Sequence, residues 1–362
     1  MYARTRAADA AKRLLRTASH RLMTPDPTTD RVLTRSLDRS LDWRVGEAAP
    51  VANRCFEPSF AETAGRTLAF QVQPAGRGIS LADQREISNG AVRGLIEEHF
   101  GAEPLAWFDG KAEAALARSA SAGHGARYAL GLDAGGLTEV QASYEWGPAV
   151  VDMLPGPVMD LAQLALSALP GLRPFATTIR CGRASGGQQI AFELAQETAL
   201  DALKPLMEAL GMGERHGSLV TLMAFVLGAR FTLPPSVATL TLLHTQRGPE
   251  LRLDVNVDAL PDAPEQLLPL MRLPLTERPQ NLAALDAWMT AMTPDGYWGP
   301  GSVTVLSVRV RPDMGARLAL YLRPMALDAA APAAEAPVAA PAAPPPVAQQ
   351  SAALRAYNRA YL

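Results

Sequence analysis

The sequence has few cysteines and no long apolar run, and each shortage excludes a class of protein. Its two cysteines, Cys55 and Cys181, stand without CxxC or histidine spacing, which argues against a zinc site and a disulfide framework. No stretch of about 18 apolar residues occurs, so we expect no membrane insertion. The basic N-terminus lacks the apolar segment of a secretory signal, so we expect a cytoplasmic protein. The formal net charge of −2 gives no basic field, so we expect no nucleic-acid partner.

Several sequence motifs of known chemistry are also absent. There is no Walker loop and no GxSxG elbow, and we interpret AGG and SGG as hairpin turns. The chain lacks the DDxxD cluster that is typical of all-helical terpenoid synthases, and Asp254 and Asp258 are weak candidates for Mg²⁺. The five histidines have no ligand spacing, so we expect no zinc or iron held by the protein. They are His20, His99, His124, His216 and His244.

What the sequence does have is enough apolar residues for a core, 48% of the chain, arranged in a repeating pattern. A strand at Arg66–Val72 is followed by four pairs of alternating strands joined by turn residues. The predicted pairs are Arg127–Asp133 with Thr138–Trp146, Thr177–Gly182 with Gln188–Ala195, Ala238–Thr245 with Glu250–Val257, and Val303–Arg311 with Arg317–Arg323. Helical periodicity covers residues 3–23, 32–41, 81–99 with Ser80 as cap, 111–119, a segment ending at Leu169, 199–210, 218–230, 264–271 and 282–292.

Hairpins favour antiparallel neighbours, so this pattern predicts an α+β fold with about nine or ten antiparallel strands. Two architectures fit: an open sheet with helices on one face, and a closed barrel with the helices outside. We divide the chain into an N-terminal helical segment (1–50), the repeating αββα body (51–328), an Ala/Pro-rich linker (329–350) and a short C-terminal helix (351–362).

Side chains alternate between the two faces of a strand, so residue parity predicts which polar groups lie together. Several strands combine one aliphatic face with one polar face that is rich in arginine. The arginines concerned are Arg66, Arg252, Arg309 and Arg323. In an open sheet they would be ordinary surface residues. In a barrel they would line the interior with tyrosines and suit an anionic ligand such as a diphosphate.

Four stretches of sequence carry a resemblance to a known family: RCFEPSF with AGRTLAFQV, YALGLDAGGLTEVQASY, QIAFELAQETALDALKPLM, and SVRVRP with LALYLRP. They resemble the aromatic prenyltransferases of the ABBA fold, or PT barrel, and most of all the peptide prenyltransferases of bacterial cyanobactin pathways. The similarity covers about residues 55–325. It implies an antiparallel ten-stranded β-barrel surrounded by α-helices.

The resemblance also implies roles for individual residues. Glu57 would lie near the acceptor nucleophile, either orienting it or taking its proton. The diphosphate would be held by Arg66, Arg252, Arg309 and Arg323, together with Gln141, which stands where relatives carry lysine. Tyr144 and Tyr321 would shield an allylic cation, although parity places Tyr144 on the face opposite Gln141.

The predicted reaction is transfer of a prenyl group from an isoprenoid diphosphate to an aromatic side chain of a peptide, in natural-product (RiPP) biosynthesis. Mg²⁺ would be held mainly by the diphosphate. Two alternatives stay open at this point. One is prenylation of a free small aromatic molecule such as an indole or a phenol, and the other is a non-catalytic binding or scaffold protein of the same architecture.

Overall fold

The structure is a computed structural model that describes residues 5–327 except 46–53, 122, 146–150, 153, 184, 229, 262 and 264–266. The chain divides into two units after Ala331, and all the described residues belong to the first. The predicted linker at 329–350 and the predicted helix at 351–362 lie outside the described residues.

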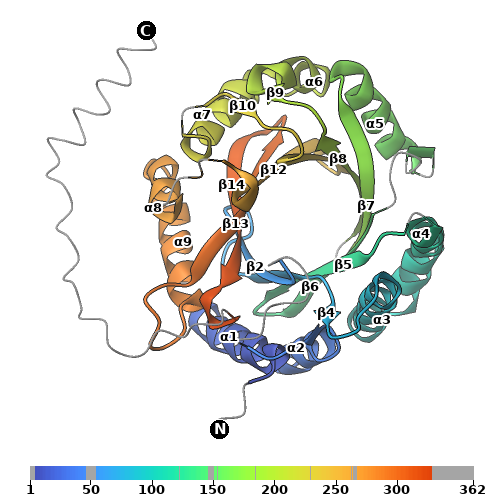
Figure 1. The fold of residues 1–362 in the computed structure, drawn as a ribbon, viewed down its shortest axis with the longest axis vertical. Helices are drawn as coiled ribbons and strands as arrows, with labels where there is room; N and C mark the ends of the chain where they lie inside the picture. The colour runs from blue at the N-terminus through green and yellow to red at the C-terminus, as the bar shows by residue number, and fades with distance from the viewer. Residues whose placement is uncertain are drawn as a thin grey trace, which may run out of the picture. The chain divides into compact units, whose positions relative to one another are not determined.

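Ten antiparallel strands form a closed barrel at the centre of this unit (Figure 1). Each strand pairs with the next one along the chain, and the last strand, β14, closes the ring on the first, β2. The strands are β2 (Phe56–Ala61), β3 (Leu68–Val72), β5 (Ala126–Asp133), β6 (Gly136–Glu145), β7 (Leu172–Gly182), β8 (Gly186–Leu194), β11 (Ala238–Thr245), β12 (Gly248–Asn256), β13 (Gly301–Arg311) and β14 (Met314–Pro324). The predicted fold class is confirmed, and of the two architectures that fitted the sequence the protein adopts the barrel.

The first strand of the barrel, β2, is the one that the strand pattern misses. It contains Pro58, which cannot donate a hydrogen bond to a neighbouring strand and therefore argues against a strand in any sequence reading. In the barrel β2 pairs with β14 only from Ser59 onward, so Pro58 stands beyond that ladder. The following strand, β3, begins at Leu68 rather than at the predicted Arg66.

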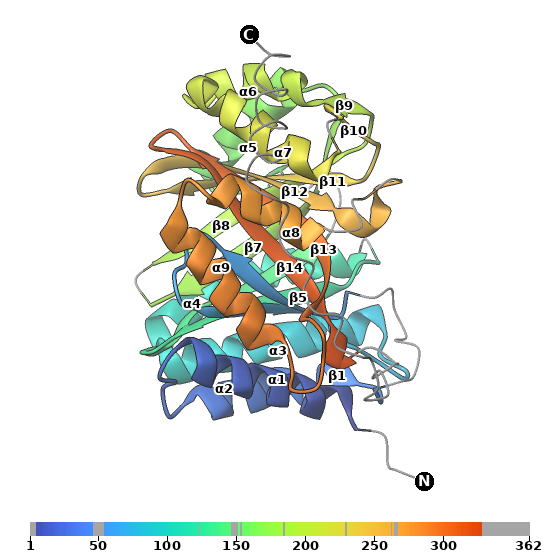
Figure 2. The same cartoon turned by 90° about the vertical axis from the view of Figure 1, so that its left-hand side faces the viewer.

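The helices lie around the outside of the barrel (Figures 1 and 2). They are α1 (Ala7–Leu22), α2 (Thr29–Leu37), α3 (Leu81–His99), α4 (Ala102–Ser121), α5 (Gly156–Ala168), α6 (Lys204–Ala209), α7 (His216–Val226), α8 (Leu267–Arg272) and α9 (Pro279–Met292). Ser80 caps α3 as predicted, since its side chain accepts a hydrogen bond from the Asp83 backbone N–H. Helix α4 begins nine residues before the predicted Lys111. None of the described helices is both long and apolar enough to cross a bilayer.

The hydrophobic core lies between the outer face of the barrel and these helices. Leu251, Leu253 and Val255 of β12 are fully buried there, as parity predicts for the aliphatic face. Helix α9 packs on β2 through Trp288 and Phe60, whose ring centroids are 5.8 Å apart. Because the aliphatic face is covered from outside, the opposite polar face of each strand points into the barrel.

Two short pairings accompany the barrel. Strand β1 (Leu41–Asp42) lies parallel to β4 (Ala75–Gly76), and β9 (Thr198–Ala199) pairs with β10 (Thr232–Leu233). These four short strands are not part of the barrel sheet. The lumen is formed by the ten barrel strands alone.

Candidate active site

The barrel encloses a cavity of about 330 Å³ to which all ten strands contribute side chains. Small residues occupy much of its wall. Ala61, Ala69, Ala129, Ala176 and Ala191 all line it. A barrel of about eight strands is normally filled by its own side chains, so a ten-stranded barrel lined by alanine leaves room for a ligand.

Two arginines lie directly opposite each other on neighbouring strands of this wall. Arg252 of β12 and Arg309 of β13 are partners in the strand register, and both line the cavity. Like charges in that arrangement repel each other unless a counter-charge is present. Arg252 has one, because its Nε lies 3.0 Å from Oδ2 of Asp254. Burial acts to lower the pKa of Arg252, but the nearby negative charges, first that of Asp254, outweigh it and the pKa is raised.

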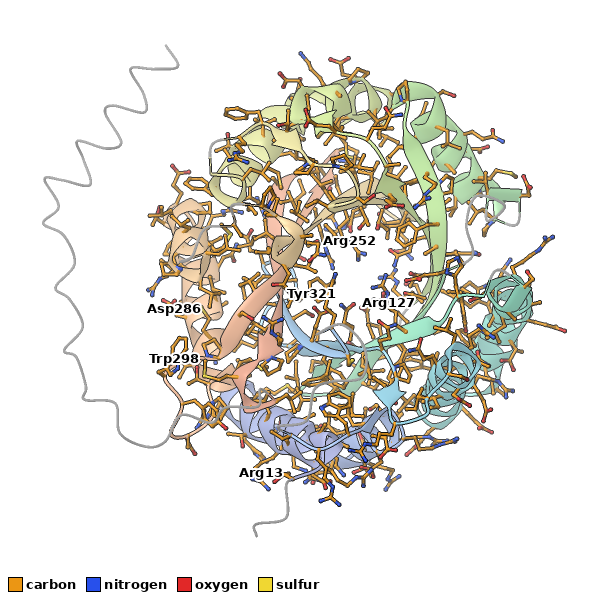
Figure 3. The ribbon with its side chains drawn as sticks, viewed as in Figure 1. Arg13, Arg127, Arg252, Asp286, Trp298 and Tyr321 are labelled. Carbon is orange, nitrogen blue, oxygen red and sulfur yellow. The ribbon has the colours of Figure 1, made fainter. Side chains whose placement is uncertain are left out.

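Arg309 differs from Arg252 in having no counter-charge. Within the described residues it makes neither an ion pair nor a hydrogen bond, and its Nε is buried. Arg309 is half-buried, and a cation whose Nε is buried without a partner is costly, so it indicates an anion that the protein itself does not supply. Figure 3 shows Arg252, Arg127 and Tyr321 reaching toward the lumen from three different strands, β12, β5 and β14.

Glu57 lies in the wall beside this cavity, and its carboxylate is fully buried. It accepts hydrogen bonds from three donors on separate segments: Arg54 Nε at 3.0 Å, Thr304 Oγ1 at 2.5 Å, and Gln71 Nε2. Thr304 reaches it because β13 has a bulge between Val303 and Val305, where the register with β14 shifts. Arg54 and Gln71 line the cavity, so Glu57 is connected to the lumen through its partners.

No protein-family model matches the sequence, and no curated protein matches it. Solved structures match the fold. The apo form of prenyltransferase PriB is 17% identical with a TM-score of 0.69 and covers 90% of this chain and 98% of its own. The 5-dimethylallyltryptophan synthase from Streptomyces coelicolor is 16% identical, with a TM-score of 0.64 and coverages of 90% and 99%. AnaPT from Neosartorya fischeri is 12% identical, with a TM-score of 0.60 and coverages of 90% and 94%.

The chain has the PT-barrel fold. At these identities the likeness establishes the fold alone, and it confirms the sequence resemblance at that level. In the PT barrel of this chain, four of the predicted site residues come together around the cavity: Gln141, Arg252, Arg309 and Tyr321. Gln141 Nε2 donates to Oε1 of Glu139 at 2.8 Å.

The other predicted ligand-binding residues lie elsewhere on the PT barrel. Arg66 is exposed ahead of β3 and does not line the cavity. Arg323 sits at the end of β14, where its Nη1 lies 3.5 Å from Oδ2 of Asp258. Tyr144 is fully buried on the outer face, and its hydroxyl donates to Oδ1 of Asn89 in α3 at 2.9 Å. Its outward position agrees with its parity and removes it from any aromatic wall inside the lumen.

Two of the arginines that line the cavity are not among the predicted site residues. Arg127 begins the predicted strand 127–133 and shares a face with Ala129, so parity alone could have found it. Its Nη2 lies 3.8 Å from Oε1 of Glu145. Arg54 precedes β2 and follows residues outside the described set, and no periodic pattern surrounds it. Only the three-dimensional contact with Glu57 identifies Arg54.

The cavity wall does not fit a metal ion held by protein ligands. No group of three or more His, Cys, Asp or Glu side chains that could hold a metal occurs in the part of the chain that the structure describes. Beside the arginine pair stands one carboxylate, Asp254, and it is already ion-paired to Arg252. An anion bound at this part of the cavity would therefore contact the arginine side chains and not a metal ion held by the protein.

Proposed function

We propose that this protein transfers a prenyl group from an isoprenoid diphosphate to an aromatic acceptor bound in the lumen. The observation that carries the proposal is Arg309, a half-buried cation without a partner among the described residues, which lines the barrel cavity directly opposite Arg252. The fold supports it, since its structural neighbours include prenyltransferase PriB and dimethylallyltryptophan synthases.

In this proposal Arg252 and Arg309 bind the diphosphate, and the Gln141 amide faces it from β6. Guanidinium groups match phosphate oxygens geometrically and stay charged. As the bond between the allylic carbon and the diphosphate oxygen breaks, the electron pair leaves with the diphosphate. Two fixed cations in the barrel lumen stabilise that growing negative charge, and stabilisation of this kind is usually the largest contribution to catalysis.

The acceptor ring then forms the new carbon–carbon bond to the allylic carbon, and the ring proton is lost. We propose Glu57 as the group that receives the proton, since its carboxylate is held in the wall by cavity-lining Arg54 and Gln71. Tyr321 is the aromatic side chain that we propose for shielding the cation, since it lines the cavity from β14. Few other aromatic rings line the lumen, so the allylic cation would be shielded by aromatic contact mainly on the side of Tyr321.

Two classes of acceptor are open: an aromatic side chain of a peptide, and a free small aromatic molecule. A peptide side chain is what the cyanobactin-type resemblance implies. A free small aromatic is suggested by the 5-dimethylallyltryptophan synthase from Streptomyces coelicolor, which has been solved in complex with DMASPP and Trp. The cavity of about 330 Å³ lies at the lower end of the range for pockets that bind small molecules, roughly 300–1,000 Å³, and must hold donor and acceptor together. We therefore favour a small aromatic acceptor.

Within the described residues the cavity wall has no set of metal-ligating carboxylates, so the protein's own side chains would not hold Mg²⁺. An ion brought by the diphosphate would be held by phosphate oxygens, and the protein's own contribution to charge neutralisation is the arginine pair.

The test of this function is the Arg309→Ala variant, with Arg311→Ala as its matched control. Both arginines stand on the same face of β13, but Arg311 is ion-paired to Asp313 and does not line the cavity. We expect Arg309→Ala to weaken the binding of dimethylallyl thiodiphosphate about tenfold to a hundredfold, the value of a charge-assisted hydrogen bond or two. Arg311→Ala should bind like the wild type.

Binding is measured by isothermal titration calorimetry. Transfer is measured by mass spectrometry with five-, ten- and fifteen-carbon diphosphates as donors. The acceptors are indole, phenol, tryptophan and a mixed peptide library. If Arg309→Ala binds and transfers as well as the wild type, the lumen is not the diphosphate site. If the wild-type protein binds none of the diphosphates, the non-catalytic alternative is favoured.

A further inference from the structure

The arginine pair of the cavity wall continues onto a third strand. Arg309 of β13 is the register partner of Arg252 in β12 and also of Arg317 in β14. Arg317 shares its strand face with Tyr321, which lines the cavity, but Arg317 itself does not line it. Its Nη1 donates to the carbonyl oxygen of Ala316 at 3.1 Å, and it has no ion pair within the described residues. The row of arginines therefore runs from the cavity wall to a half-buried cation outside the cavity.

This row lies near the end of the barrel at which the strands of each hairpin turn back. Arg309 and Arg317 are two and three residues from the ends of β13 and β14 at the turn between them. Strand β14 is antiparallel to β2, so the turn that follows β2 lies at the same end. That turn carries Arg66, which is exposed and makes neither a hydrogen bond nor an ion pair within the described part of the chain. We name this the hairpin end, defined by the turn residues 62–67 and 312–313.

The cavity reaches both ends of the barrel. At the hairpin end it is lined by Ala64 and Thr67, which belong to the turn after β2. At the opposite end it is lined by Arg54, which precedes β2, and by Ser236, which precedes β11. A ligand therefore has two ends by which it can reach the lumen, and the charges at the two ends distinguish them.

The opposite end presents arginines that are already paired. Arg127, Arg173 and Arg323 are ion-paired with Glu145, Glu193 and Asp258, respectively. Each of these pairs carries little net charge, so this end gives an anion no strong attraction.

The hairpin end carries an excess of positive charge. Arg311 and Asp313 are paired with each other there, whereas Arg66 and Arg317 have no counter-charge among the described residues and stand near the equally unpaired Arg309. An opening lined by charge of one sign concentrates ions of the opposite sign and raises their rate of association. The hairpin end is therefore the one that attracts an anion.

We infer that the isoprenoid diphosphate enters the lumen, and the diphosphate product leaves it, at the hairpin end, attracted by Arg66 and Arg317. This inference rests on the proposed function, because it takes Arg252 and Arg309 to bind the diphosphate. The bound donor then has its diphosphate toward the hairpin end and its prenyl chain deeper in the barrel. Tyr321 is four residues along β14 from Arg317, about 13 Å in a strand, which places the proposed aromatic shield on the prenyl side of the diphosphate.

The first test measures how fast inorganic pyrophosphate exchanges with the full chain, using the ³¹P NMR line shape to obtain association and dissociation rates. We expect Arg66→Ala and Arg317→Ala each to lower the association rate about threefold to tenfold at low salt, and the difference to shrink at about 0.5 M salt. The dissociation rate should stay within about twofold, because charges at a rim act mainly on association. Arg309→Ala should instead raise the dissociation rate, since Arg309 lines the cavity.

Arg173→Ala is the matched control. Like Arg66, Arg173 is exposed, but it lies at the opposite end and is paired with Glu193. It removes the same charge and should keep the wild-type association rate at both salt concentrations. Thermal unfolding shows that each variant is folded.

The second test blocks one end at a time with a bulky maleimide. Ala64→Cys and Ser236→Cys each introduce a thiol at an exposed, cavity-lining position, one at each end, whereas the native Cys55 and Cys181 are buried. The label on Ala64→Cys should slow pyrophosphate exchange about tenfold or more, because association through a blocked opening is slower. The label on Ser236→Cys should leave exchange near the wild-type rate.

The inference is overturned if folded Arg66→Ala and Arg317→Ala variants both keep the wild-type association rate. It is overturned equally if the label on Ser236→Cys slows exchange as much as the label on Ala64→Cys. Either result, with pyrophosphate still bound and with its dissociation accelerated by Arg309→Ala, would keep the proposed diphosphate site and reject this route. A wild-type protein that binds no pyrophosphate and no prenyl diphosphate would reject both.

Discussion

At the scale of single residues, the site at which an anion can bind in the lumen depends on which charged side chains already have partners. Arg54 is ion-paired with Glu57 and Arg252 with Asp254, and Arg180 lies 3.4 Å from Glu139. Each of these pairs carries little net charge, so Arg252 would offer a diphosphate its N–H donors while the net positive charge comes from Arg309. Arg309 is left as the uncompensated cation in the described wall, and its position decides where a diphosphate would bind.

The two cysteines give a prediction about pH. Burial raises the pKa of the Cys55 thiol to about 11, with the charge of Glu57 adding to the effect. Burial also raises the pKa of Cys181 to about 11, against a small opposing effect of Arg180. An unfolded thiol ionises near pH 8.5, so the folded state binds more protons than the unfolded state above that pH.

We therefore expect both thiols to react slowly with a disulfide reagent at pH 8 in the folded protein and rapidly in guanidinium. The free energy of unfolding should fall as the pH rises from about 8.5 toward 11, because the unfolded thiols ionise first. Reagent kinetics and urea titrations at several pH values measure this. Fast reaction of the folded protein would show that the thiols are accessible. A Cys181→Ala variant, with one thiol left, separates the two rates.

At this scale, sequence parity succeeded where strands are regular and failed where local geometry changes. It grouped Arg252, Arg309, Gln141 and Tyr321 on the polar faces of their strands, and these faces line the cavity. It could not show that Arg66 stands outside the strand, or that Arg323 is drawn to Asp258 on a following turn. Such pairings are tertiary contacts, and alternation along one strand carries no information about them.

At the scale of elements, Glu62 connects the three segments that meet where the barrel closes. It follows β2, its buried carboxylate accepts from the backbone N–H of Leu318 in β14 at 2.6 Å, and Nη1 of Arg278 approaches it to 2.7 Å. Asn281 of α9 donates a further bond at 2.8 Å. One carboxylate thus joins β2, β14 and the start of α9.

We expect Glu62→Gln to lower the free energy of unfolding by about 2 kcal/mol, because the buried carboxylate is lost and Arg278 keeps an unpaired charge. Urea denaturation with an unchanged slope would measure it. Glu277→Gln is the control, since Glu277 is an exposed neighbour of Arg278. Equal midpoints for the wild type and Glu62→Gln would mean that this junction contributes little to stability.

The elements that sequence reasoning missed share a physical cause. Strand β2 contains Pro58, and the bulge that delivers Thr304 to Glu57 interrupts the register of β13. Both are departures from regular alternation, and both help to position the Glu57 carboxylate. Rules based on regular strands are least informative at such positions.

At the scale of the whole described unit, closure of the sheet turns polar strand faces into a binding cavity. Parity shows that the polar residues of β12 and β13 share a face, but the same pattern fits an open sheet facing water. The deciding contact is the pairing of Ala319, Leu320 and Tyr321 with Ala61, Phe60 and Ser59, between segments more than 250 residues apart. That pairing of first and last strands is not visible in local periodicity.

Closure also predicts which truncations the protein tolerates. All ten strands and the described helices lie before Ala331, so we expect a chain that ends there to unfold in one cooperative transition and to bind dimethylallyl thiodiphosphate like the full chain. A chain that ends at Asp313 lacks β14, which leaves the edges of β13 and β2 unpaired. It should aggregate or lack a cooperative transition, and it should not bind. Circular dichroism melts measure the unfolding transition of each truncated chain, and calorimetry measures its binding.

Loss of binding in the chain that ends at Ala331 would show that the cavity needs residues beyond the barrel. Binding by the chain that ends at Asp313 would show that a closed lumen is not required.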